Sequence, residues 1–432
     1  MNGRRVIARV AFVLTFLVTV ALLPPPYALA KPATSVDYPE RATVTHFSGL
    51  AFDTCSAPSL PTMRKWRSSR YQGVGVYIGG ATRACSQRHL TKSWVHGVTA
   101  MRWRLVPVYT GKQAPCRSHA KKFLIKPDRA RAQGLRAARH AVKRSARLGL
   151  LHGSALYLDI ESYPTSHDRC RKAVLRYISG WTSGLHQRGY LSGVYVSGAS
   201  GGIHLSGAHG SRAFARPDAI WVAQWDDDAT VSDLYGLTDR RWAHGQRAKQ
   251  FRGPHKEKHG GAAMTIDSNV FRAPVATVAR QVRVTSSVPL KGRNHPTKKS
   301  SIITTYRPGS TVGVVCQRRG AKAAGTRVWN LLANGTYVSD RFVNAGKGVP
   351  RCAYPYQVTR TDRLNKRAGP GTRHALAGVV YGGGLAKVVC QRRGTNVFGD
   401  RVWNKLASGA WVSDYYLATP SRRGFSKPIR RC

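Results

Sequence analysis

The sequence predicts an α/β chain in which a (β/α)8, TIM-like barrel is followed by two small all-β barrels. Between residues 46 and 271, eight short β-rich runs alternate with amphipathic or basic helical stretches, a pattern typical of one closed barrel. After residue 280, Val, Cys and Trp recur at a fixed offset, which indicates a duplicated smaller unit.

The barrel strands are predicted where β-branched and aromatic residues cluster between turn residues. They cover residues 46–54, 73–80, 105–111, 155–162, 191–198, 219–226, 247–253 and 264–271. The clearest helices cover 128–150 and 168–188; in the first, Leu135, Ala138 and Val142 recur at helical spacing beside Arg and Lys. The Gly-rich stretch 199–217 predicts a long loop in place of one outer helix.

Acidic residues gather where these strands end. Asp159 and Glu161 close the apolar run Leu156–Ile160, and their spacing puts both side chains on one face of a strand, about 6–7 Å apart. Two carboxylates at that distance perturb each other's pKa and can reach one sugar ring. We therefore interpret Glu161 and Asp159 as catalytic residues.

Three more acids, Asp53, Asp226 and Asp267, fall at or near the C-terminal ends of predicted strands. Catalytic groups of such barrels gather on that face, so we expect these three to bind substrate. Two structural alternatives stay open: Asp226 could cap a turn or helix in the run Asp226–Asp228, and Asp267 could make a structural hydrogen bond to a neighbouring loop.

The N-terminal residues have the parts of a secretory signal over 1–30. Arg4, Arg5 and Arg9 precede an apolar run over 10–23, and Ala28-Leu29-Ala30 supplies a cleavage site. The mature chain would begin at Lys31 with a leader to residue 45, exported by the Sec or the twin-arginine route. No later segment is predicted to span a membrane.

All eight cysteines lie in the mature chain, which predicts disulfides in an oxidising compartment. Cys316 with Cys352 and Cys390 with Cys432 would close the two later repeats. Three pairings remain open for the four cysteines of the barrel, which are Cys55, Cys85, Cys116 and Cys170. No two cysteines have the short spacing of a zinc site, and no cofactor is implied.

The formal charge of +51 becomes +48 without the three signal arginines. Such a surface favours an anionic partner: teichoic-type polymers, anionic peptidoglycan, phospholipid head groups or released nucleic acid. No nucleic-acid recognition motif supports the last of these. A well-solvated surface produced by a general preference for Arg is the alternative.

The repeat has a period of 74 residues. Val284, Cys316 and Val328-Trp329-Asn330 recur as Val358, Cys390 and Val402-Trp403-Asn404. Short β-runs between Gly and Pro turns, with one Trp strand in each copy, predict SH3-like barrels over 280–352 and 353–432.

Five landmarks in the first 280 residues occur in an order that resembles a known domain. They are Gly49–Asp53, Leu158–Glu161, Gly193–Tyr195, Trp221–Trp225 and Ile266–Phe271. Together they resemble the glycoside-hydrolase-like barrel domain of secreted bacterial proteins, a group related to the family 25 muramidases. The resemblance implies that Glu161 is the proton donor and Asp159 orients the substrate, with Asp53 and Asp267 shaping the site. Thr54-Cys55, after Asp53, departs from the usual muramidase loop.

The second repeat resembles bacterial SH3 domains. Its segment Leu364–Gly371 is similar to the L-N-x-R-x-G-P-G signature, of which the first repeat keeps only Leu290, Arg293 and Pro296. The resemblance implies wall binding, mainly through the second copy.

The sequence therefore predicts a secreted, muramidase-like hydrolase of peptidoglycan; the alternative is a wall-binding protein on a barrel that does not cut glycan. A serine hydrolase is disfavoured: Gly198–Gly202 fits G-x-S-x-G around Ser200, but the next residues lack a helical pattern. A metal site at His255 and His259 is disfavoured for the same reason.

Overall fold

A computed structural model describes residues 35–39, 42–117, 123–211, 213–243, 245–346 and 348–432. The predicted signal over 1–30 lies outside the described residues. Within these ranges, every helix is too short or too polar to cross a bilayer.

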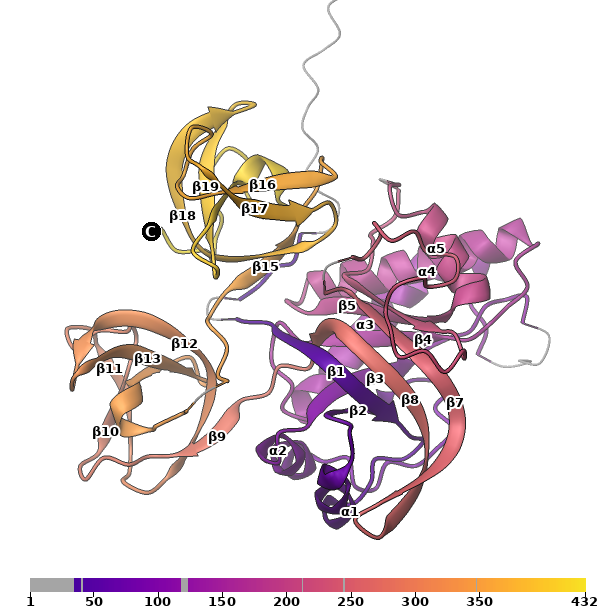
Figure 1. Ribbon diagram of the computed structural model, residues 1–432, viewed down its shortest axis with the longest axis horizontal. Helices are drawn as coiled ribbons and strands as arrows, with labels where there is room; N and C mark the ends of the chain where they lie inside the picture. The colour runs from indigo at the N-terminus through magenta and orange to yellow at the C-terminus, as the bar shows by residue number, and fades with distance from the viewer. Residues whose placement is uncertain (1–34, 40–41, 118–122, 212, 244, 347) are drawn as a thin grey trace, which may run out of the picture. The chain divides into compact units, whose positions relative to one another are not determined.

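Eight strands form a closed barrel in chain order, and the last strand pairs with the first (Figure 1). Each lies where a strand was predicted. Their apolar residues point both into the barrel and toward the outer helices, so that all six residues of β4 are buried, as expected for strands covered on both faces. The strands are β1 Thr45–Asp53, β2 Gly73–Gly79, β3 Arg104–Thr110, β4 Ala155–Ile160, β5 Leu191–Ser197, β6 Ala219–Ala223, β7 Arg247–His259 and β8 Ala262–Val275.

The last strand differs from the (β/α)8 expectation. Strands β1 to β7 are parallel to one another, but β8 is antiparallel to both of its neighbours, β7 and β1. Only Gly260 and Gly261 separate β7 from β8, and both have positive φ (+55° and +81°). A two-residue turn of this kind joins antiparallel strands, whereas a parallel pair needs a crossover of a dozen residues or more. The Gly-Gly pair was therefore a hairpin signal.

Helices cover the outside of the barrel. Ser59 and Thr91 cap the first two, accepting hydrogen bonds from the backbone N of Thr62 (3.3 Å) and Trp94 (3.1 Å). The predicted loop over 199–217 instead begins with a π-helical turn and a short helix. The helical elements are α1 Leu60–Lys65, η1 Trp66–Ser68, α2 Lys92–Ala100, η2 Pro127–Arg129, α3 Ala130–Arg147, α4 Asp168–His186, η3 Gly198–Gly202 and α5 Ile203–Gly207.

Aromatic side chains fill the barrel interior. The ring of Trp221 lies 5.1 Å from that of Phe271 and 6.0 Å from that of Tyr157, measured between centroids. The indole N–H of Trp221 donates to Asn269 Oδ1 (3.0 Å), so its one polar atom is paired. The acids considered below lie beyond this plug, at the end of the barrel where β1 to β7 terminate.

Two six-stranded sheets follow, and they have the same strand order read in opposite directions: β11-β10-β14-β13-β12-β9 and β15-β18-β19-β20-β16-β17. Their elements are β9 Arg280–Arg283, β10 Leu290–Arg293, β11 Ile302–Tyr306, β12 Thr311–Ala323, β13 Thr326–Leu332, β14 Tyr337–Ser339 and η4 Asp340–Phe342 in the first repeat. In the second they are β15 Tyr354–Gln357, β16 Arg363–Arg367, β17 Leu376–Tyr381, β18 Leu385–Val397, β19 Asp400–Leu406, β20 Trp411–Ser413 and η5 Asp414–Tyr416.

The same buried hydrogen-bond triad occurs in each repeat. In the second, Gln391 Nε2 donates to Asn404 Oδ1 (3.0 Å) and Asp414 Oδ1 (3.0 Å), and Asn404 Nδ2 donates to the same carboxylate oxygen (2.7 Å). Residues 74 positions earlier form the same three bonds in the first repeat. The sequence period is therefore also a structural one.

Four disulfides cross-link the chain: Cys55–Cys85, Cys116–Cys170, Cys316–Cys352 and Cys390–Cys432. The last two are the pairs expected from the repeat. The first two resolve the three possibilities in the barrel: Cys55–Cys85 joins the loops after β1 and β2, and Cys116–Cys170 joins the loop after β3 to the first turn of α4. Cross-links of this span stabilise a fold by restricting the unfolded chain.

Candidate active site

Asp53 is the last residue of β1 and is only 1% exposed. Its Oδ1 accepts a hydrogen bond from Tyr77 (3.0 Å), and its Oδ2 accepts from Gln250 Nε2 (3.1 Å) and Asn269 Nδ2 (2.8 Å). On the neighbouring strand, a Cβ added to Gly75 would lie 2.5 Å from Asp53 Cβ. Glycine at this position therefore makes room for the carboxylate.

Asp267 lies directly across the β1–β8 pair from Asp53. Burial, together with the negative charge of Asp53 and a hydrogen bond to it, raises the pKa of Asp267 to about 8. Burial also raises the pKa of Asp53, although the bonds from Asn269, Tyr77 and Gln250 oppose this. Near neutral pH, Asp267 is therefore the carboxyl of this pair that holds a proton.

Asp267 was expected at the acidic end of the barrel because it was placed near the C-terminal end of a parallel strand, and this placement was wrong. It lies in the first half of β8, which runs antiparallel to β1. Because β8 is reversed, its early residues lie at the end of the barrel where the parallel strands terminate.

Asp159 and Glu161 are fixed by one residue that the sequence gave no reason to select, Gln113. Its Nε2 donates to the carbonyl of Asp159 (3.1 Å), and its Oε1 accepts from the backbone N of Glu161 (2.9 Å). Gln113 is itself buried. It therefore holds the backbone on both sides of Ile160 and sets where the two carboxylates point.

The buried Asp159 carboxyl has a pKa well above its ordinary value. Burial is the largest cause, the charges of Glu161 and Asp53 add to it, and Arg117 opposes it. Its Oδ1 is buried without a hydrogen-bond partner among the described residues. Glu161 follows the end of β4 and is half-buried. Four of the five predicted acids thus gather at one end of the barrel.

Asp226 has a different environment. Its carboxylate accepts from the buried Lys249 Nζ (2.7 Å) and from Gln224 Nε2 (2.7 Å), and these bonds lower its pKa although burial opposes them. Its other oxygen accepts from the backbone N of Asp228 (3.1 Å). Asp226, three residues beyond the end of β6, therefore forms the turn that was the alternative interpretation of the Asp226–Asp228 run.

Aromatic and amide side chains complete the acidic end of the barrel. Gln250 Oε1 accepts from Tyr195 (2.9 Å) and from the indole N–H of Trp225 (3.0 Å), which leaves its Nε2 to donate to Asp53. Trp225 is 64% exposed although its N–H is held. Sequence reasoning missed Gln250 and Tyr77, whose partners lie far away in the chain.

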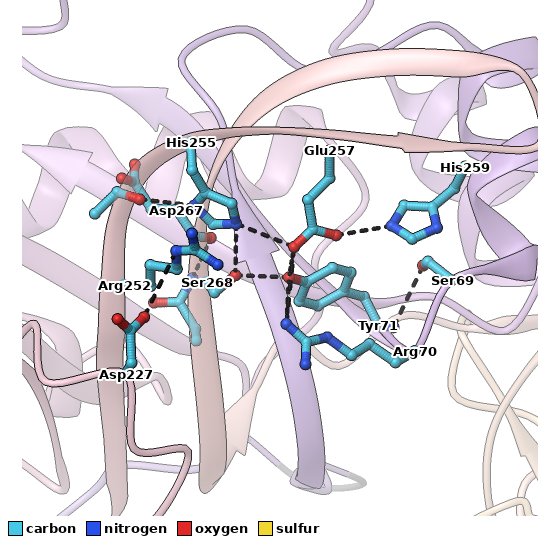
Figure 2. A network of polar contacts seen from close by, with 12 residues as sticks. Ser69, Arg70, Tyr71, Asp227, Arg252, His255, Glu257, His259, Asp267 and Ser268 are labelled. Atoms are coloured by element: carbon cyan, nitrogen blue, oxygen red, sulfur yellow. Dashed lines mark hydrogen bonds and ion pairs between the residues drawn. The ribbon is translucent and has the colours of Figure 1, made fainter.

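Beyond the barrel, the β7–β8 hairpin carries a polar network next to Asp267 (Figure 2). Three residues spaced by two, His255, Glu257 and His259, lie on one face of β7. Glu257 accepts from His255 Nε2 (3.0 Å) and His259 Nε2 (2.7 Å) and from Tyr71 (2.8 Å). Tyr71 also bonds to Ser268 (2.6 Å), the residue after Asp267.

These contacts determine the ionisation of Glu257. Burial opposes its ionisation, but the hydrogen bonds from His259, Tyr71 and His255, with the charge of Arg70, lower its pKa to about 2. The two histidines lie on a strand and both bond to one carboxylate. Within the described ranges, no set of three His, Cys, Asp or Glu side chains is arranged to hold a metal ion.

The arrangement around Ser200 differs in part from the prediction, because a helix does follow it: α5 begins at Ile203. Ser200 Oγ is nevertheless buried without a hydrogen-bond partner among the described residues. The nearby His204 bonds to Tyr163 through Nδ1 (3.0 Å). Ser200 therefore lacks the paired base that a serine nucleophile needs.

Residues 64–271 match a family model described as the Rv2525c-like, glycoside hydrolase-like domain. The matched segment includes Asp159, Glu161 and Asp267 and begins after Asp53. No curated protein matches the chain.

Solved structures similar to the barrel cover about half of this chain. The Tat-secreted protein Rv2525c of Mycobacterium tuberculosis, in complex with L-tartrate, is 16% identical, with a TM-score of 0.37 over 52% of this chain and 96% of that one. The catalytic domain of endolysin ply40 from Listeria monocytogenes bacteriophage P40 is 15% identical, with a TM-score of 0.33 over 52% of this chain and 94% of that one. A family 25 glycosyl hydrolase from Bacillus anthracis is 13% identical, with a TM-score of 0.34 over 54% of this chain and 94% of that one.

Proposed function

We propose that the chain is a secreted, muramidase-like glycoside hydrolase that cleaves the glycan of bacterial cell walls. One observation carries the proposal: Asp53, Asp159, Glu161 and Asp267 gather at one end of a barrel whose sequence matches a glycoside hydrolase-like family. The whole chain has only 19 acidic residues against 70 Lys and Arg, so the gathering of four of them in one site points to a chemical role.

Glu161 is the proton donor in this proposal. It stands at the rim, half-buried, with its backbone held by Gln113. Asp159 lies deeper, and burial raises the pKa of its carboxyl well above the ordinary value. In the proposed step, Glu161 delivers its proton to the glycosidic oxygen, and the neighbouring Asp159 carboxyl orients the acetamido group of the substrate.

The bond then breaks between C1 of the sugar and the protonated leaving oxygen. The substrate's own N-acetyl oxygen attacks C1 and forms a cyclic oxazolinium ion, a known exception to the two-carboxylate scheme. Asp159 stabilises the positive charge on the acetamido nitrogen. Water, deprotonated by Glu161, opens the ring and gives a product with the original configuration at C1. Protonated Asp267 holds a neighbouring sugar hydroxyl, and the buried Asp53 supports Asp267 from behind.

Trp225 supplies a surface for a sugar ring. Its indole N–H is held by Gln250 (3.0 Å), and one face lies against Gly253, where an added Cβ would come within 2.9 Å of the ring. The remaining face is open to stack on the apolar side of a pyranose. Trp225 would thus place the glycan over the four carboxylates.

The two repeats are proposed to be SH3-like wall-binding modules, and the chain is proposed to reach the wall by Sec or twin-arginine export. Four disulfides support an oxidising compartment. The large positive charge supports an anionic polymer as the partner.

Hydrolysis of soluble, peptide-free glycan strands tests both the activity and the mechanism. Wild-type protein should cleave the strands with retention at C1, observed by proton NMR of the first product. Glu161→Gln should remove cleavage, and Asp159→Asn should slow it by at least 100-fold. An inverted product would exclude the N-acetyl nucleophile. Binding of intact strands without cleavage would instead support a glycan-binding protein.

A further inference from the structure

The second repeat carries a surface cluster of three aromatic rings, formed by Phe398, Tyr415 and Tyr416. The ring centroid of Tyr415 lies 5.0 Å from that of Phe398 and 5.0 Å from that of Tyr416. Phe398 is 68% exposed, more than any other large hydrophobic residue described. Phe398 belongs to the β18–β19 turn, whereas the two tyrosines belong to η5.

Phe398 occupies a backbone conformation that disfavours a bulky side chain. Its φ is +48°, and the next residue, Gly399, has φ +83°. Asn, Asp and Gly are preferred at such turn positions, because a left-handed conformation brings the Cβ of another residue close to the following carbonyl oxygen. The turn does not require an aromatic residue and exposure to water opposes one here, so the exposed ring points to a functional contact.

The first repeat shows that the turn does not need the ring. Its equivalent residues, Ala324 and Gly325, have φ of +48° and +84°. Alanine therefore supports the same turn in the same sheet. The other members of the cluster also differ: Tyr415 and Tyr416 correspond to Arg341 and Phe342 at the 74-residue offset.

Two arginines lie beside the rings. The guanidinium of Arg360 stacks 4.6 Å from the Tyr415 centroid and donates to the carbonyl of the same residue (3.0 Å). Burial lowers the pKa of Arg422, and the positive charge of Arg360 lowers it further. Arg422 Nε is buried without a hydrogen-bond partner, and within the described ranges neither arginine forms an ion pair.

The neighbouring acid, Asp400, interacts electrostatically with Arg360 but forms no ion pair with it among the described residues. Asp400 is buried, and its carboxylate accepts from the backbone N of Val402 (2.8 Å). The arginines are also particular to the second repeat. Position 360 corresponds to Ser286, and Arg422 falls in a segment, Asp414 to Cys432, that is six residues longer than its counterpart from Asp340 to Cys352.

We propose that Phe398, Tyr415, Arg360 and Arg422 bind a carboxylate-bearing saccharide, and that the occupant is a glycan strand of the cell wall. The apolar face of a pyranose stacks on the exposed ring of Phe398, as sugars do on aromatic side chains. The guanidiniums of Arg360 and Arg422, whose positive charges act on each other, take its carboxylate through charge-assisted hydrogen bonds. This inference rests on the proposed wall-directed function, and it assigns the binding to the second repeat alone.

The test measures binding of peptide-free glycan strands, in which each muramic acid has a free lactyl carboxylate, to the full mature chain by titration calorimetry. Chitin oligosaccharides of equal length are the matched neutral probe. All proteins carry Glu161→Gln so that the strands stay intact. Because the barrel is also expected to bind, the isotherm is fitted with two sites.

Phe398→Ala installs the residue that the first repeat already has, so the turn should fold unchanged. We expect Phe398→Ala and Arg422→Ala each to weaken the second site on the order of tenfold, and the neutral probe to bind it similarly weakly. The control Leu376→Ala, which removes an equally exposed side chain (65%) of the same repeat, should change affinity less than twofold.

Unchanged affinity in Phe398→Ala, equal binding of the neutral probe, or binding of free stem peptides in place of strands would each overturn the proposal. Its failure is distinct from failure of the proposed hydrolase. If strand binding depends on Phe398 but the wild type does not cleave the strands, the proposed binding surface stands and the proposed hydrolase fails. If the wild type cleaves the strands but binding does not depend on Phe398, the hydrolase stands and the binding surface fails.

Discussion

Asp53 and Asp267 are cross-strand partners in the antiparallel β1–β8 pair. Two carboxyls in that position, in a buried site, cannot both ionise at neutral pH without a large electrostatic penalty. The Asp53 carboxylate accepts three hydrogen bonds from neutral donors, whereas Asp267 Oδ1 is buried without a partner among the described residues. The negative charge is therefore held on Asp53 and the proton on Asp267.

Asp267 should make stability depend on pH. Its pKa rises from 3.8 to about 8 on folding, so between these values the folded chain holds a proton that the unfolded chain has released. Its contribution to stability therefore decreases as pH rises through this window. Between pH 5 and pH 9, we expect the Tm of the wild type to fall by about 5 °C more than the Tm of Asp267→Asn.

Thermal unfolding at pH 5, 7 and 9 checks this expectation. The matched control is Asp128→Asn, because the Asp128 carboxylate is mostly exposed and forms an ion pair with its neighbour Arg129 (3.6 Å). Parallel pH profiles for Asp267→Asn and wild type would show that Asp267 ionises together with Asp53.

Glu257 should have the opposite pH dependence. Its pKa falls from 4.5 to about 2 on folding, so its stabilising contribution is present above pH 4.5 and is lost as pH falls toward 2. Glu257→Gln removes the negative charge that accepts from His255, His259 and Tyr71, and we expect it to lower the free energy of unfolding by about 1–3 kcal/mol at pH 7. Urea unfolding at pH 7 and pH 3 measures this.

The difference between Glu257→Gln and wild type should shrink at pH 3. If the difference stays constant, the stabilisation comes from packing of the hairpin and not from the ionised carboxylate.

Much of the fold was predictable from local patterns, and the misses have a common physical cause. Buried β-runs located all eight barrel strands, and the alternation in Leu156–Ile160 placed Asp159 on the inward face. The direction of β8 was missed because strand direction depends on the connection, here Gly260-Gly261, and not on the strand's own residues. The helix at Ile203 was missed because tertiary packing overrode a weak local propensity.

The candidate site was predictable only in its acids. Carboxylates at strand ends are visible in a sequence, but the amides that orient them are not. Gln113 contacts residues 46 positions or more away, and Gln250 contacts Asp53 across 197 positions. The turn alternative set Asp226 apart in the sequence, but its ion pair with Lys249 could not be predicted, because no local pattern reveals a buried cation.

Gln113 should be a positioning residue. Replacing it with Leu removes both bonds to the Asp159–Glu161 segment while keeping its volume, and we expect kcat on soluble strands to fall 10- to 100-fold with little change in KM. Gln113→Glu restores an acceptor for the Glu161 backbone N and should recover part of the loss. A fall in stability without a change in kcat would assign Gln113 to packing alone.

Gly75 should be required for the position of Asp53. Gly75→Ala puts a Cβ 2.5 Å from Asp53 Cβ, which forces the carboxylate away from its three donors, at a cost of about 1–3 kcal/mol in stability. Activity should fall more than 10-fold under conditions where the variant is folded. Gly207→Ala, where the added Cβ has nothing within 4 Å, is the control and should retain activity.

Digestion of purified peptidoglycan tests the central claim most directly. The mature wild type, Glu161→Gln and Asp226→Asn are incubated with the polymer, and released fragments are identified by mass spectrometry. We predict new reducing ends from the wild type and from Asp226→Asn, and none from Glu161→Gln. Release by Glu161→Gln, or no release by the wild type while it sediments with the polymer, would contradict the account.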